Sequence, residues 1–141
     1  MANTESSTSQ LTIAETVISS RFWLGSSDYP SPDIMGAAFA AANPGFVTVS
    51  LRRQTAGQVK HNDYRHRIEE WLASSRAKLL PNTAGATSAK EAIHLAVLAR
   101  ELFNTQWIKL EVIGDDYSLQ PDVFELVAAA KELQQQGFSV L

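Results

Sequence analysis

Residues 107–113 read Trp-Ile-Lys-Leu-Glu-Val-Ile, a run with the two-residue alternation that is typical of a β-strand. Successive side chains of a strand point to opposite faces, so Lys109 and Glu111 share one face, roughly 6.6 Å apart along the chain. The side chains that alternate with them are all aliphatic: Ile108, Leu110 and Val112. Because one face of this segment has no polar group, we expect neighbouring elements to bury it.

Short apolar runs precede and follow this segment, and longer amphipathic stretches separate them. The other predicted strands are residues 22–25, 46–51, 79–80 and 138–141; the predicted helices are residues 32–44, 64–75, 88–103 and 121–136; residues 11–20 predict a short hairpin. Successive strands begin about 25 to 30 residues apart, which suits right-handed crossovers between parallel neighbours. The sequence therefore predicts an α/β protein of parallel β/α units, and this pattern fits both an open sheet and part of a barrel.

Three of the predicted helices have clear sequence signals. The predicted inward side chains of residues 121–136 are Val123, Leu126, Val127, Ala130 and Leu133, with Pro121 in the first turn and Gly137 at the end. The predicted inward side chains of residues 32–44 are Ile34, Met35, Ala38, Phe39 and Ala42. In residues 88–103, Ser88 and Glu91 have the spacing of a capping box. We expect the apolar faces to pack against the sheet.

The composition of the 141 residues, 45% hydrophobic and 19% charged, fits one globular domain over residues 11–141. Residues 1–10 are polar and lack the basic start and apolar stretch of a secretory signal, so we expect a disordered tail there. No apolar run approaches the roughly 18 residues of a membrane span. These features predict a cytoplasmic protein with no membrane partner.

The charge pattern argues against nucleic acid as a partner. The net charge is -3, the sequence pI is about 5.6, and the Lys and Arg residues are scattered. The absence of cysteine excludes disulfides and thiolate metal sites. His61, Asp63 and His66 have a metal-like composition, but their spacing matches no closed zinc motif. We therefore interpret them as a surface helix start and predict no metal site.

Lys109 and Glu111 are the candidate catalytic residues, and two interpretations of them remain open. Burying charges costs free energy unless they are paired, so a structural ion pair or a solvated strand end is the more common explanation of Lys-x-Glu. In the other interpretation, desolvation makes the lysine a carbonyl nucleophile, while the carboxylate opposes that effect and serves as a proton acceptor. The spacing supplies the minimum for imine formation followed by proton abstraction beside the former carbonyl.

Asn82 and Gly85 are candidate substrate-binding residues. They follow a predicted strand, where a strand-to-helix loop can position polar groups of a substrate, although tight turns also require Asn and Gly. Arg52 and Arg53 follow another predicted strand, where phosphate steering competes with solvation or a salt bridge.

Three stretches carry a resemblance to a known family. They read Pro-Asn-Thr-Ala-Gly at 81–85, Trp-Ile-Lys-Leu-Glu-Val-Ile-Gly-Asp at 107–115 and Gly-Phe-Ser-Val-Leu at 137–141. Together, in this order and at this spacing, they resemble the N-terminal half of bacterial thiazole synthase, an enzyme of thiamin biosynthesis. The resemblance also extends over residues 11–51, so it covers nearly everything after the predicted tail.

The resemblance implies the first half of a (β/α)8 TIM barrel. It also implies a transferase that joins 1-deoxy-D-xylulose 5-phosphate, dehydroglycine and sulfur from the thiocarboxylate of a ubiquitin-like sulfur-carrier protein. By this similarity, Lys109 matches the lysine that forms a Schiff base with the ketose phosphate, and Glu111 matches a carboxylate of its isomerisation. The resemblance implies no cofactor.

A complete barrel needs roughly 250 residues, so these 141 residues are expected to lack the second half. By the resemblance, the family's phosphate-holding glycine-rich loops and a further active-site aspartate belong to that half. An unpaired strand edge favours pairing with another chain, so we expect a homo-oligomer. One alternative is a truncated, noncatalytic half-barrel that oligomerises or binds a partner. Another is an open α/β binder of small molecules in which Lys109 and Glu111 are only a structural pair.

Overall fold

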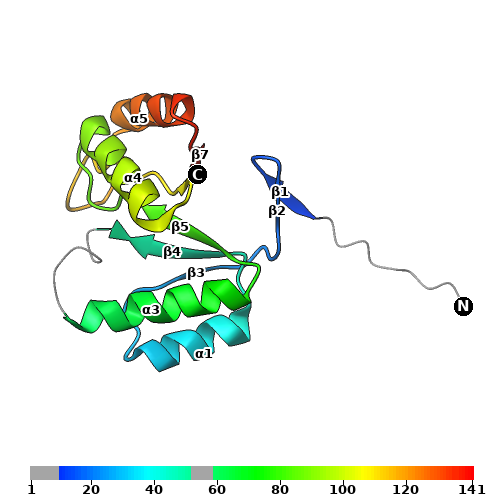
Figure 1. Ribbon diagram of the computed structural model, residues 1–141. Coiled ribbons are helices and arrows are strands. Elements are labelled where there is room, and N and C mark those ends of the chain that lie inside the picture. The colour runs from blue at the N-terminus through cyan, green and yellow to red at the C-terminus, as the bar shows by residue number, and fades with distance from the viewer. Residues whose placement is uncertain (1–9, 52–58) are drawn as a thin grey trace, which may run out of the picture.

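A computed structural model describes residues 10–51 and 59–141 of the chain (Figure 1). Its strands are β1 (Leu11–Ile13), β2 (Thr16–Ile18), β3 (Trp23–Gly25), β4 (Phe46–Ser50), β5 (Lys78–Asn82), β6 (Trp107–Ile108) and β7 (Ser139–Val140). Its helices are α1 (Pro32–Ala42), α3 (Val59–Ser74), α4 (Ala89–Phe103) and α5 (Val123–Gln135). The predicted tail, apart from Gln10, lies outside the described residues, as do Arg52 and Arg53.

The strands pair in the order in which they occur in the chain. β1 and β2 form the predicted antiparallel hairpin, β3, β4 and β5 form a parallel sheet, and β6 pairs with β7 in parallel. An isolated parallel bridge between Asn82 and Lys109 joins β5 to the end of β6. Within the described ranges, the series from β3 to β7 is a partial barrel that does not close. The predicted α/β class with parallel β/α units is confirmed.

Side-chain caps fix where the helices begin, as the sequence signals predict. The Ser31 hydroxyl accepts a hydrogen bond from the Ile34 N–H at the start of α1. The Ser88 hydroxyl accepts from the Glu91 N–H at the start of α4, which is the predicted capping-box pair. Both α1 and α4 end at an asparagine in the left-handed conformation, Asn43 and Asn104.

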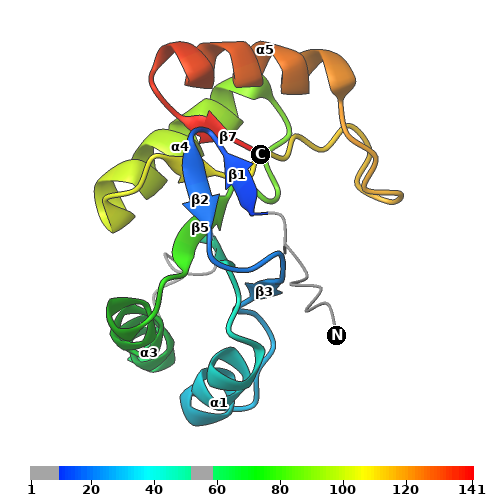
Figure 2. The same ribbon diagram turned by 90° about the vertical axis from the view of Figure 1, so that its right-hand side faces the viewer.

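The helices lie in two pairs, α1 beside α3 and α4 beside α5 (Figures 1 and 2). Two apolar clusters lie between the sheet and these helices. The first consists of Met35, Phe39, Val47, Val49 and Ile68. The second, around β6, consists of Leu51, Ala96, Ala99, Ile108, Leu133 and Phe138. Each β/α unit therefore buries the outer face of its strand under its own helices.

The hairpin covers the opposite, inner face of the sheet near the amino ends of the strands. Ile18 of β2 packs against Phe46 and Leu80, which are both fully buried. The Phe46 ring also has edge contacts with Trp23 and Trp107 at centroid distances of 4.9 and 5.1 Å. This aromatic and aliphatic layer fills the inner face near the amino ends, and polar side chains follow it at the carboxyl ends of the strands.

The strand predicted over residues 107–113 is shorter than expected. Regular pairing of this segment is with β7 and covers Trp107 and Ile108. Its pairing with β5 is limited to the bridge between Asn82 and Lys109, because the chain turns away after Asn82 through Gly85, whose φ of 85° is in the left-handed region that glycine favours. The alternation itself continues, since Ile108 and Val112 are buried on the outer face.

Several helix details differ from the prediction. Val123 and Val127 of α5 and Ile34 of α1 are exposed, whereas Ala129 of α5 is buried. Pro121 precedes the Asp122 cap and is not in the first turn of α5. The helix predicted from residue 64 begins at Val59. None of the helices in the described ranges is long and apolar enough to cross a lipid bilayer.

Candidate active site

Polar side chains from three neighbouring strands form a row at the carboxyl end of the sheet. Ser50 of β4 is in register with Asn82 of β5, and Asn82 is in register with Lys109 beyond β6. Residues in register on parallel strands face the same side, so Ser50, Asn82 and Lys109 share the inner face. Ser50 carries no signal in the sequence, because strand register cannot be derived from a single strand.

The predicted pair Lys109 and Glu111 lies together at this end of the sheet. The Lys109 Nζ atom is 3.1 Å from the Glu111 Oε1 atom, which makes an ion pair. The two side chains are 44% and 35% exposed, so the pair is accessible and is not deeply desolvated. A distance of 3.1 Å is within the range for direct proton transfer between an amine and a carboxylate.

Backbone hydrogen bonds hold Lys109 in place. Its N–H donates to the Pro81 carbonyl at 2.8 Å, and its carbonyl accepts from the Thr83 N–H at 3.2 Å. Pro81 lies in β5, and Thr83 is the first residue after it. The position of the amine therefore depends on the β5 backbone and not on the ion pair with Glu111 alone.

A side chain of the loop after β5 holds Glu111 in place. The Thr83 hydroxyl accepts a hydrogen bond from the Glu111 N–H and donates one to the Glu111 carbonyl, both at 2.8 Å. Thr83 is fully buried. This contact could not be predicted, because a threonine in Pro-Asn-Thr-Ala-Gly gives no signal of a partner 28 residues later.

Asn82 and Gly85, the candidate substrate-binding residues, both have a role in the turn after β5. The Asn82 side-chain oxygen accepts a hydrogen bond from the Ala84 N–H at 3.3 Å, as in an Asx turn. Gly85 has the positive φ that this turn requires. Asn82 is also in register with Lys109, so its side chain lies on the same face as the amine.

Comparison with known proteins identifies the family. The profile of thiazole biosynthesis protein ThiG matches residues 12–141, nearly the whole described chain. The chain belongs to the ThiG family. Thiazole synthase of Coxiella burnetii (strain RSA 493 / Nine Mile phase I) is 53% identical over 123 residues, which are 87% of this chain and 46% of that protein. Thiazole synthase of Agrobacterium fabrum (strain C58 / ATCC 33970) is 48% identical over 130 residues, 92% of this chain and 49% of that protein.

A solved structure has the same fold as this ThiG-family chain. In the complex of BexX and CysO from Amycolatopsis orientalis, the matching chain gives a TM-score of 0.69 at 22% sequence identity. The match covers 94% of this chain and 52% of that chain. The chain thus spans about half the length of the curated relatives and of the structure that it matches. The expected resemblance to part of the thiazole synthase family is confirmed.

His66 of α3 lies away from this row of polar side chains. His66 is exposed, and its Nε2 atom is 3.2 Å from the Glu70 Oε1 atom one turn later. Because α3 begins at Val59, Asp63 and His66 lie within the helix and not at its start. The side chain of His61 lies outside the described residues. Across the side chains that the structure describes, no three metal-type residues gather in a cluster.

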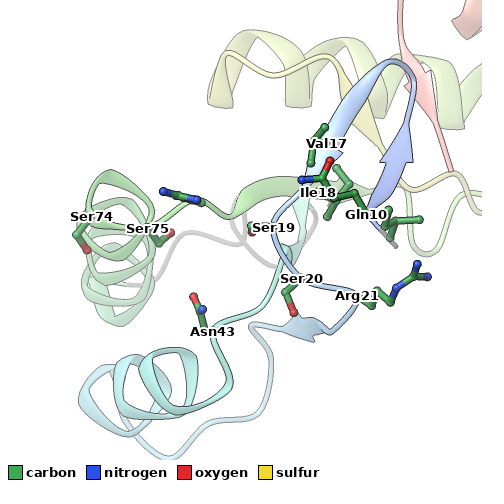
Figure 3. Close-up of a pocket in the computed structure, with 11 residues that line it drawn as sticks. Gln10, Val17, Ile18, Ser19, Ser20, Arg21, Asn43, Ser74 and Ser75 are labelled. Atoms are coloured by element: carbon green, nitrogen blue, oxygen red, sulfur yellow. The ribbon is translucent and has the colours of Figure 1, made fainter. Parts of the chain in front are cut away.

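A cavity of about 700 Å³ lies at the opposite end of the sheet from Lys109. It lies between the hairpin and the ends of α1 and α3, and Asn43, Ser74 and Ser75 line its helical side (Figure 3). Its residues precede β3, β4 and β5, so it opens at the amino ends of the strands. In β/α barrels the catalytic face is at the carboxyl ends, so this cavity is separate from the candidate site around Lys109.

An acidic loop of the ThiG-family chain follows Val112 and lies beside the carboxyl ends of the strands. Asp115 accepts hydrogen bonds from the Ser118 hydroxyl at 2.6 Å and from the Ser118 N–H at 2.7 Å. These bonds favour the charged carboxylate, so the pKa of Asp115 is held below its ordinary value of 3.8, with the hydroxyl as the largest cause. At a pH above 3.8 the Asp115 carboxylate is therefore ionised, and its hydrogen bonds to Ser118 order the loop.

Replacing Ser118 with alanine is expected to raise the pKa of Asp115 part of the way back toward 3.8, because the N–H bond remains. A carboxylate with a lowered pKa stabilises the fold above its unfolded pKa, and that contribution is lost as pH falls through the folded pKa. As the pH falls, the Ser118→Ala chain should therefore lose this stabilising contribution at a higher pH than the natural chain does. Carboxyl NMR titration measures the effect, Ser118→Thr is the control that keeps the hydroxyl, and identical titration of Asp115 in all three chains would contradict the prediction.

Proposed function

We propose that the chain forms an imine between the Lys109 amine and the ketone carbon of 1-deoxy-D-xylulose 5-phosphate, as the first step of thiazole formation. The observation that carries this proposal is the 3.1 Å contact between the Lys109 amine and the Glu111 carboxylate. The contact lies on the inner face at the carboxyl ends of the strands, the catalytic end of β/α barrels. Family membership supports the choice of substrate.

The pair can provide each proton transfer that the step needs. Glu111 takes a proton from the Lys109 ammonium, and the neutral amine attacks the ketone carbon. The carbonyl oxygen, left as an alkoxide, takes a proton from the newly bonded nitrogen. The hydroxyl then leaves as water after Glu111 returns the first proton to it, and the nitrogen lone pair forms the protonated imine. The carboxylate is then again ionised and lies next to the imine, where it can remove a proton from the adjacent carbon.

Later steps of the proposed function use dehydroglycine and sulfur. We propose that the sulfur arrives as the thiocarboxylate of a small ubiquitin-like carrier protein. In support, the similar chain from Amycolatopsis orientalis was solved in a complex with CysO. The partial exposure of Lys109 and Glu111 leaves the imine accessible to a carrier tail from the carboxyl end of the sheet. The imine chemistry needs no cofactor, because the protonated imine formed on Lys109 is itself the electron sink.

Borohydride trapping tests the imine directly. The 141-residue chain is incubated with 1-deoxy-D-xylulose 5-phosphate, reduced and digested, and the added mass is mapped by mass spectrometry. The reduced adduct is expected on Lys109. The exposed lysines Lys90 and Lys131 are internal controls, since they have no carboxylate arranged in this way on an inner sheet face. Labelling spread evenly over all lysines would remove the proposal.

The exposed flank of α5 favours a second candidate function, a partner-binding half-barrel. Val123, Phe124 and Val127 are 56%, 85% and 52% exposed, and they form an apolar flank of this helix. The opposite side of α5 already packs on α4 through Ala129 and Leu133. In a β/α barrel each helix has a neighbour on both sides, so this flank is where the next helix of the series would pack.

The partner that best fits the flank supplies the remaining β/α units of a barrel. The chain contributes the five parallel strands β3 to β7, and a closed barrel of this type has eight. A second copy would bring five more strands and a second hairpin to the amino end, which is more than closure needs. The relatives are about twice as long as the matched region, which leaves more than enough chain for three further units.

Replacing Val127 with aspartate is expected to weaken capture of such a partner by about tenfold or more, because it places a charge in an apolar interface. The chain is co-expressed with the unmatched half of the Coxiella burnetii relative, and light scattering measures a one-to-one complex. Ala73→Asp is the matched control, since Ala73 is an exposed residue of α3 and lies outside this flank. A dimer of the chain alone, or equal capture by both variants, would contradict the prediction.

A further inference from the structure

The Thr83 hydroxyl bonds the backbone of Glu111 in place of the backbone groups that a continued β5 strand would have supplied. In a regular parallel ladder, the backbone of β5 would continue to bond the segment after β6. Here the Thr83 N–H already bonds the Lys109 carbonyl, and the Thr83 carbonyl accepts from the Ala86 N–H as the loop turns away. The N–H and the carbonyl of Glu111 would therefore lose their sheet partners. One hydroxyl serves both, because it can donate and accept at the same time.

We infer that Thr83 is a positioning residue that holds Glu111 in place for proton transfer, an inference that rests on the proposed function. The hydroxyl fixes the Glu111 backbone from both sides at 2.8 Å, and full burial prevents water from replacing it. Lys109 does not depend on this hydroxyl, since its backbone bonds go to the Pro81 carbonyl and the Thr83 N–H. The two residues of the pair therefore have separate supports.

This separation predicts which step depends on the hydroxyl. Once the imine has formed on Lys109, the Glu111 carboxylate removes a proton from the carbon next to the imine carbon. The electrons of that C–H bond form a carbon–carbon double bond, and the electrons of the protonated C=N bond move to the nitrogen. Return of a proton from Glu111 reverses the step, so the reaction in D2O places deuterium on that carbon. This exchange requires an accurately placed carboxylate, whereas water at this partly exposed pair can relay the protons of imine formation when Glu111 is displaced.

Thr83→Val and Thr83→Ser test the inference in the full 141-residue chain. Valine keeps the shape of threonine but removes the hydroxyl, while serine keeps the hydroxyl. In Thr83→Val, borohydride trapping on Lys109 is expected to stay within about twofold, and deuterium exchange per trapped imine to fall by about 10- to 100-fold. In Thr83→Ser, both quantities are expected to stay within about twofold of the natural chain.

Each outcome decides a different point. Absence of trapping in the natural chain would overturn the proposed function, and the inference about Thr83 with it. Normal trapping together with normal exchange in Thr83→Val would overturn the positioning role alone. If Thr83→Val does not fold by circular dichroism, Thr83→Ser still decides, because a large loss of exchange despite the retained hydroxyl would overturn the inference.

Discussion

The Lys109→Ala chain is expected to gain no mass when it is incubated with 1-deoxy-D-xylulose 5-phosphate and reduced with borohydride. The variant lacks the only amine that lies next to Glu111 on the inner face of the described sheet. Imine formation requires a nucleophilic nitrogen, and neither the carboxylate nor the hydroxyl of Ser50 can replace it. Intact-mass spectrometry after reduction measures the loss, which should be complete.

Two controls separate chemistry from stability in this experiment. Lys109→Arg keeps a cation beside Glu111 but has no amine that loses its proton near neutral pH, so it should also give no adduct. Lys131→Ala removes an exposed lysine of α5 and should leave the adduct unchanged. An adduct of equal size in Lys109→Ala would show that another lysine reacts and would remove the covalent role.

The ion pair itself adds little to the stability of the fold. Lys109 is 44% exposed and Glu111 is 35% exposed, and partly exposed pairs of this kind contribute about 0–1 kcal/mol. The Lys109→Ala chain should therefore fold normally. Such a small contribution to the free energy of unfolding does not by itself explain why both charges lie on the inner face. Their placement there supports the reactive interpretation.

The sequence was sufficient to predict the order of the elements and the two faces of the segment around Lys109. Hydrophobic periodicity distinguishes strands from helices, because the repeat is two residues in one and 3.6 in the other. The same alternation placed Lys109 and Glu111 on one face, although regular pairing ends at Ile108. The alternation persists because burial of Ile108 and Val112 holds the outer face in place.

Contacts between distant segments could not be predicted in this way. The bond of Thr83 to Glu111 depends on where β5 turns away from β6, and no local pattern specifies that point. The register that brings Ser50 beside Asn82 is likewise a property of two strands together.

The faces of α5 illustrate a different limit. Its sequence has two apolar flanks, one with Val123 and Val127 and another with Leu126, Ala129 and Leu133. Periodicity treats them as one wide face, whereas the structure buries the second flank on α4 and leaves the first exposed. Which flank is covered depends on what lies next to the helix, and this information is not in the helix sequence.

The Gly45→Ala chain is expected to lose about 3 kcal/mol or more of unfolding free energy, because an added methyl group would overlap the backbone of the hairpin connection. A Cβ atom at Gly45 would lie 2.1 Å from the Ser20 carbonyl oxygen and 2.6 Å from the Ile18 Cγ2 atom. Backbone atoms cannot rotate out of the way as side chains can. Gly45 itself is fixed, since its N–H bonds the Phe22 carbonyl and its carbonyl accepts from the Lys78 N–H.

Relief of this overlap requires the hairpin to move away from the sheet, and that would expose Phe46 and Leu80 on the inner face. Thermal unfolding followed by circular dichroism should show a lower Tm by roughly 10 °C, and limited proteolysis should cut the hairpin first. Gly25→Ala is the matched control, since its added Cβ would meet only the Thr48 hydroxyl at 3.7 Å, an ordinary contact. Equal Tm values for the two variants would mean that the hairpin does not depend on the close approach of Ser20 to Gly45.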